Sequence, residues 1–240
     1  MSKLWRVLAI FVLIMCSTPA AAQEKTGVKQ GFELKPGAAR ILLIEPSVRV
    51  GAQSTGGMFE PNADWTSQAK QNIERELAAI QGRLGNVVDR LELDATDQSA
   101  DLRRYHALFG AVADSVIEYQ FFPGNRLPTK KKDKHVFEWS VGPGLNTLHA
   151  LEGYDYVLMI RTKDAYGSTG RKLLQFAAAL GGIGVKSGEH VGMAGLIDVR
   201  TGDLVWLNAD LQMGGDVRTE EGANKRVSQL LEGFPGRSAE

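Results

Sequence analysis

The chain has 240 residues, of which 28 are Lys or Arg and 28 are Asp or Glu, and 43% of its residues are hydrophobic. This composition is that of a globular protein, and the balance of charge excludes a partner attracted by bulk charge, such as a nucleic acid. The single cysteine excludes disulfide bonds within the chain and thiolate metal clusters. The one basic run, residues 130–134, is expected to be a solvated loop.

The beginning of the chain has the three parts of a secretory signal peptide. Two basic residues precede an apolar run at 8–15, and Ala20 and Ala22 are the small residues of a cleavage site before Gln23. The apolar run is much shorter than the roughly 20 residues that span a bilayer, which favours cleavage over a membrane anchor. We therefore predict a signal peptide at 1–22 and a periplasmic protein that begins at Gln23.

Cys16 is an alternative processing site, because a lipoprotein signal places a cysteine directly after its apolar run. The preceding residue is Met15, where that signal requires a small residue, so the alanine site is the better match. Lipidation of Cys16 would instead attach the mature chain to a membrane and associate the protein with the outer membrane.

The remaining sequence predicts one α/β domain at 39–232, between a flexible lead at 23–38 and a disordered tail at 233–240. Strands alternate with helices, which indicates a three-layer domain with a mixed sheet of about five strands. The predicted elements, in order, are a buried strand at 39–46, a helix from Asp64 to Leu84, a strand at 87–93, helices at 99–119 and 144–151, a strand at 154–161, a helix at 171–179, a C-terminal hairpin of strands at 191–199 and 203–208, and a helix at 224–231. Residues 47–62 are predicted to be a loop because of their glycines and Pro61.

The hairpin carries a resemblance to a known group of proteins. Its sequence matches the pattern D-x-x-T-G-x-[ILV]-[ILV]-W at Asp198, Thr201, Gly202, Leu204, Val205 and Trp206. In this it resembles bacterial envelope proteins related to the curli-secretion lipoprotein CsgG and to the amino-terminal domain of TolB. The resemblance implies an α/β fold in the cell envelope and offers one functional alternative, a CsgG-like secretion or channel accessory that oligomerises at the outer membrane.

Catalytic and cofactor-binding residues form no recognisable pattern in this sequence. The run from Gly181 to Ser187 lacks the glycine before Lys-Ser that a phosphate-binding loop requires. The four histidines, none within metal-chelating spacing of another, are His106, His135, His149 and His190. We therefore predict no enzyme activity, no cofactor and no metal site, with an uncharacterised periplasmic enzyme as a further alternative.

Residues 173–185 are apolar on nearly all sides. The favoured interpretation is a buried helix that covers the sheet. The alternative is an exposed interaction patch formed by Leu173, Leu174, Phe176, Leu180 and Ile183. The segment is too short to span a bilayer. Our leading hypothesis is a non-enzymatic envelope protein that acts through protein–protein contacts, with another envelope protein or a second copy as partner and with membrane contact as a further option.

Overall fold

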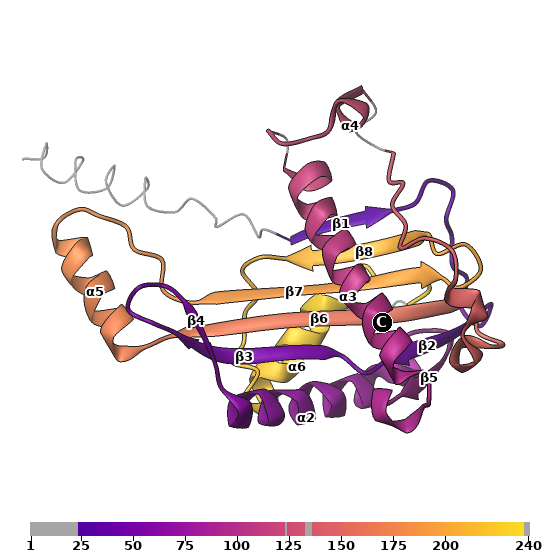
Figure 1. Cartoon of the computed structure of the whole chain (residues 1–240), viewed down its shortest axis with the longest axis horizontal. Helices are drawn as coiled ribbons and strands as arrows, with labels where there is room; N and C mark the ends of the chain where they lie inside the picture. The colour runs from indigo at the N-terminus through magenta and orange to yellow at the C-terminus, as the bar shows by residue number, and fades with distance from the viewer. Residues whose placement is uncertain (1–23, 123, 133–135, 238–240) are drawn as a thin grey trace, which may run out of the picture.

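The structure is a computed structural model that describes residues 24–122, 124–132 and 136–237. The expected cleavage site at Ala20, Ala22 and Gln23, and the alternative site at Cys16, lie outside these residues. The described chain forms a mixed α/β fold around an eight-stranded sheet (Figure 1). The expected class is therefore confirmed, while the expected number of about five strands is wrong.

Six strands follow the order β1-β8-β7-β6-β2-β5, and β3 and β4 extend the sheet beside β6. Strand β6 pairs in parallel with β2 and β3, and β2 pairs in parallel with β5; the other pairs are antiparallel. The strands are β1 (Glu24–Val28), β2 (Arg40–Ile44), β3 (Ser47–Gln53), β4 (Phe59–Pro61), β5 (Val87–Leu91), β6 (Tyr156–Gly167), β7 (Glu189–Asp198) and β8 (Leu204–Asp210).

Helices cover both faces of the sheet, which gives three layers (Figure 1). Helix α3 (Ser99–Val116) lies on one face, and its Phe109 packs in a core with Met159 and Leu207. Helices α2 (Ala63–Ile80) and α6 (Glu220–Leu230) lie on the other face, around Trp206. Apolar side chains alternate between the two cores along each central strand, as the two-residue period of a strand requires.

Strand β3 is one reason for the wrong strand number. Its sequence contains Gly51 and is followed by further glycines, which predicted a loop. The strand forms because β6 is 12 residues long and offers Arg161–Gly167 as a parallel partner beyond the end of β2. A long neighbour thus determines the extended structure of a segment that has weak strand propensity of its own.

The two ends of the domain also differ from expectation. The predicted flexible lead contains β1, which pairs with β8 along its whole length. Its residues are polar because it is an edge strand with little burial. In the predicted disordered tail, Phe234 is buried and its ring lies 5.3 Å from that of Trp206. Residues 233–237 therefore close one core of the domain.

Four of the five predicted helices are present, with shifted boundaries. The N-cap of α2 is Asn62 rather than Asp64, and its side chain accepts a hydrogen bond from the Trp65 backbone N–H at 2.9 Å. After α3 the chain continues as a π-helix over Ile117–Phe121. The helix expected at 144–151 is two short 3-10 turns, and part of the basic run forms α4 (Pro128–Lys132).

The predicted C-terminal hairpin is confirmed as β7 and β8. Its turn explains the sequence pattern. The Asp198 carboxylate accepts hydrogen bonds from the backbone N–H groups of Arg200 (2.8 Å) and Thr201 (2.9 Å). Gly202 has a φ of 75°, which favours glycine, and a Cβ there would lie 1.9 Å from the carbonyl oxygen of Gly142.

Candidate interaction surface

Helix α5 (Thr169–Leu180) extends away from the body of the domain, at one end of the sheet (Figure 1). It begins at Ser168, whose side chain accepts a hydrogen bond from the Arg171 backbone N–H at 3.2 Å. None of its residues is buried. The favoured expectation of a buried helix is therefore wrong, because β6 continues to Gly167 and carries the connection past the sheet faces that a helix could cover.

Four apolar side chains of α5 form one stripe. Leu173, Phe176, Ala177 and Leu180 follow the spacing i, i+3, i+4 and i+7, which places them on one side of a helix. The three large ones are 65%, 67% and 77% exposed, respectively. In most globular proteins such a stripe faces the core, whereas here it faces solvent.

The connection between β3 and β4 lies beside the base of α5 and adds Met58 to the same end of the molecule (Figure 1). Among the described residues, the large hydrophobic side chains that are more than 60% exposed all belong to this end. They are Met58, Leu173, Phe176, Leu180 and Ile183, and we call them the apolar tip. Leu174, which the sequence also assigned to the patch, lies beside them and is less exposed.

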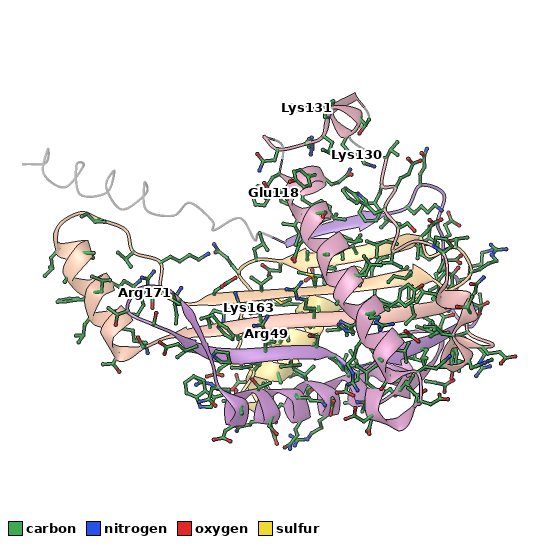
Figure 2. The ribbon with its side chains drawn as sticks, viewed as in Figure 1. Arg49, Glu118, Lys130, Lys131, Lys163 and Arg171 are labelled. Atoms are coloured by element: carbon green, nitrogen blue, oxygen red, sulfur yellow. The ribbon has the colours of Figure 1, made fainter. Side chains whose placement is uncertain are left out.

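Arg171 holds the base of the apolar tip together (Figure 2). Its guanidinium donates hydrogen bonds to the Lys186 carbonyl through Nε (3.1 Å) and Nη2 (2.7 Å), and to the Thr55 carbonyl through Nη1 (3.1 Å). The Gly188 N–H donates to the side chain of Gln53 at 2.9 Å. One side chain thus joins the start of α5, the end of its connection to β7 and the β3–β4 turn.

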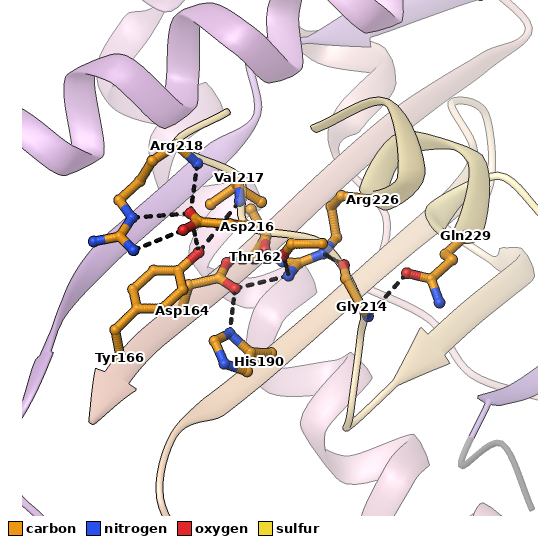
Figure 3. A network of polar contacts seen from close by, with 11 residues as sticks. Thr162, Asp164, Tyr166, His190, Gly214, Asp216, Val217, Arg218, Arg226 and Gln229 are labelled. Atoms are coloured by element: carbon orange, nitrogen blue, oxygen red, sulfur yellow. Dashed lines mark hydrogen bonds and ion pairs between the residues drawn. The ribbon is translucent and has the colours of Figure 1, made fainter. Parts of the chain in front are cut away.

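A buried charged network lies farther along β6, on the face covered by α6 (Figure 3). Arg226 and Asp164 are both fully buried and form a two-pronged ion pair, with both N···O distances 2.7 Å. Arg226 also donates to the Thr162 hydroxyl at 2.7 Å. Burial acts to raise the pKa of Asp164, but hydrogen bonds from His190 and Arg226 outweigh it and hold the pKa below its usual value.

His190 connects this network to the surface. Its Nδ1 lies 2.7 Å from Asp164, and its ring is 5.0 Å from that of Tyr166. Tyr166 donates to Asp216 at 2.8 Å, and Arg218 donates two hydrogen bonds to the same carboxylate. Hydrogen bonding from Arg218 lowers the pKa of Asp216 to about 2, whereas burial and the charge of Asp164 raise the pKa of Tyr166 above its usual value.

Sequence reasoning missed this network. The spacing of the histidines gave His190 no role as a metal ligand, and no role was predicted for Asp164 or Arg226. A signal was present, because Arg226 lies on the apolar stripe of α6 formed by Ala223, Val227 and Leu230. A charged residue at such a position requires a buried partner of opposite charge.

The other sequence candidates are dispersed over the molecule. His106 is buried on α3, and burial lowers its pKa, while His149 lies in a 3-10 turn at the other end of the sheet and His135 lies outside the described residues. The run from Gly181 to Ser187 belongs to the exposed connection after α5. In the part of the chain that the structure describes, no three His, Cys, Asp or Glu side chains are grouped as metal ligands.

Neither a protein-family description nor a curated protein sequence matches this chain. Among solved structures, similarity is found to a dodecamer of a single-substitution variant of PelC from Paraburkholderia phytofirmans, with 14% identity, coverage of 90% of this chain and 99% of that chain, and a TM-score of 0.37. A second PelC dodecamer from the same organism gives 12% identity, the same coverage and a TM-score of 0.35. Overlap at this level assigns neither a family nor an activity. Across the described residues, no helix has the length and apolar character needed to cross a membrane.

Proposed function

We propose that this chain is a non-enzymatic protein of the bacterial envelope that acts by contact, and that the apolar tip is its contact surface. The observation that carries the proposal is the exposure of the tip. Exposed apolar patches with polar surroundings mark sites that bind another macromolecule or a membrane. The tip gathers such side chains at one end of the molecule, from the α5 segment and from the β3–β4 turn.

The energetics of α5 support this proposal. An isolated helix of this length is marginal in water, and most helices are stabilised by packing of their apolar face. Helix α5 has 12 residues and no buried side chain. Burial of a large apolar side chain contributes about 1.5–3 kcal/mol, so covering members of the tip would favour docking.

A non-enzymatic role is supported by the geometry of the buried network. The oxygens of Asp164 accept hydrogen bonds from Arg226, Thr162 and His190, and the side chain is inaccessible to solvent. A carboxylate in this state is not available as a general base. The network holds α6 and the loop around Asp216 against β6 and β7, so its role is to stabilise the fold.

The compartment forms part of the proposal. The signal peptide predicted at 1–22 and the CsgG-like and TolB-like hairpin both favour the periplasm. Intact mass of the mature protein and cell fractionation test it. A mass beginning at Gln23 in the periplasmic extract supports the proposal, whereas a lipid-modified Cys16 would place the protein on a membrane.

The contact function is tested with the double variant Phe176→Asp/Leu180→Asp. Its matched control is Leu108→Asp, which changes an exposed leucine on α3. A photoreactive amino acid at Leu173 should form cross-links in the envelope that the double variant abolishes and the control retains. Equal cross-linking by all three proteins would contradict a contact role for the tip.

The second functional hypothesis is a secretion accessory that assembles into a ring. The unchanged protein and the tip variant also distinguish this hypothesis from contact with another protein. Light scattering after size-exclusion chromatography gives the mass of the mature protein. A multiple of the monomer mass that falls to the monomer in the tip variant would show that the partner is a second copy.

A further inference from the structure

We propose that the apolar tip binds end-on to the surface of a bilayer that contains anionic lipids. This inference rests on the proposed contact function and names the occupant of the same surface. Three features of the tip support it: apolar side chains on more than one side of α5, hydrogen-bonded backbone at the C-terminal end of this helix, and basic residues near its base.

The tip is apolar around more than one side. Leu174 is 41% exposed and follows Leu173 by one residue, so about 100° of helix rotation separates it from the main stripe. Beyond the helix, Ile183 and the exposed glycines around it continue the apolar surface, and Met58 adds to it from the β3–β4 turn. A groove in a protein accepts one face of a helix. A bilayer interface accepts a tip that is apolar on several sides.

Part of the backbone at the end of α5 is hydrogen-bonded, which lowers the cost of entering an apolar environment. The Ile183 N–H donates to the Ala178 carbonyl at 2.9 Å, and the Gly182 N–H donates to the Ala179 carbonyl at 3.0 Å. Gly182 has a φ of 74°. These bonds form a Schellman motif, which places the apolar Ile183 just past the helix end.

Three cations lie in the segment that contains α5, and this segment contains no acid. Arg171, Lys172 and Lys186 lie in a segment, residues 165–188, that contains no Asp or Glu. Of the acids that flank the segment, Glu189 pairs with Lys163 at 2.9 Å, and Asp164 is buried in its network. Glu60, on β4, is the exposed acid on the neighbouring hairpin.

This arrangement fits the layers of a bilayer. The apolar side chains of α5 and Ile183 would enter the acyl boundary, while Lys172 and Lys186 would meet the headgroups. Juxtamembrane Lys and Arg side chains attract anionic lipids in this way. Because α5 lies at one end of the longest axis of the molecule, a flat surface can reach the tip before it meets α2 or α3 (Figure 1).

The experiment measures flotation of the mature protein with vesicles of phosphatidylcholine alone or mixed with phosphatidylglycerol. We expect the protein to float with the anionic vesicles at least about tenfold more strongly than with the neutral ones, and to be released by salt. Phe176→Asp/Leu180→Asp should abolish flotation. Lys172→Glu/Lys186→Glu should remove the preference for anionic lipid, and Leu108→Asp should behave as the unchanged protein.

Insertion is followed separately with Phe176→Trp, whose fluorescence should shift to shorter wavelength with anionic vesicles. Absence of flotation and of this shift would overturn the lipid proposal. If the tip variant then still loses its cross-links in the envelope, the partner is a protein and the contact function stands. If the tip variant alters neither flotation nor cross-linking, both proposals fail.

Discussion

At the scale of single residues, the stability of the fold depends on the buried ion pair of Arg226 with Asp164. Both side chains are fully buried, so removal of one leaves the other without its main partner. We expect Arg226→Met to lower the free energy of unfolding by about 3–5 kcal/mol. The double variant Asp164→Leu/Arg226→Met should be less destabilised than the single one, because it removes both charges. Urea unfolding of the three proteins measures this, and a double variant that is less stable than the single one would contradict the interpretation.

The lowered pKa of Asp216 makes the free energy of unfolding depend on pH. Its pKa in the folded protein is lowered to about 2 from a reference value of 3.8. The unfolded chain therefore takes up its proton first as the pH falls, and the stabilisation present above pH 4 is lost between about pH 4 and pH 2. Asp216 is partly exposed, so after solvent screening we expect a loss of only about 1 kcal/mol.

The measurement compares urea unfolding of the unchanged protein and of Asp216→Asn over this range. The variant should be less stable at neutral pH, and its stability should fall less steeply below pH 4. Parallel curves for the two proteins would show that another carboxylate governs the loss.

At the scale of elements, the β7–β8 hairpin depends on the geometry of its turn. Gly202→Ala would place a methyl group 1.9 Å from the Gly142 carbonyl oxygen, at a φ that side chains rarely adopt. We expect it to lower the free energy of unfolding by more than about 2 kcal/mol. Gly82→Ala is the matched control, since a Cβ there meets no atom within 4 Å. Thermal unfolding of both variants tests this, and equal midpoints would contradict it.

Loss of a leucine should affect stability much less in helix α5 than in helix α6. Leu180 is 77% exposed, whereas Leu230 is fully buried against the sheet. Leu180→Ala should change the free energy of unfolding by less than about 0.5 kcal/mol, while Leu230→Ala should cost about 2–5 kcal/mol. Chemical unfolding of the two variants measures this difference. A large cost for Leu180→Ala would show that α5 packs on the domain in solution.

At the scale of the whole molecule, β1 is the edge strand that covers β8. Cleavage after Ala22 would leave this strand complete, since it begins at Glu24. A mature chain shortened by residues 23–28 should expose the edge of β8 and associate into larger species, because an unpaired strand edge is a template for further pairing. Size-exclusion chromatography checks this, with Lys25→Ser as a control that keeps the backbone pairing. A mass per particle equal to that of the unshortened mature protein would contradict it.

The sequence by itself determined the features that depend on local pattern. Apolar periodicity predicted α2, α3 and the strands at β2 and β6, and the glycine and aspartate of the turn predicted the β7–β8 hairpin. These signals are local, because a helix face or a tight turn is specified by residues only a few positions apart. The predicted signal peptide also depends on a local pattern, and it stays a prediction.

Only the tertiary structure decided the features that depend on distant partners. Strand β3 exists because β6 is long enough to pair with it, and β1 exists because β8 offers an edge. Asp164 can be buried because Arg226, on helix α6, forms an ion pair with it. The exposure of α5 also belongs here: its apolar residues are the same whether the helix covers a sheet or leaves it. Its position is decided by how far β6 and β7 extend beyond the helices, which no local pattern records.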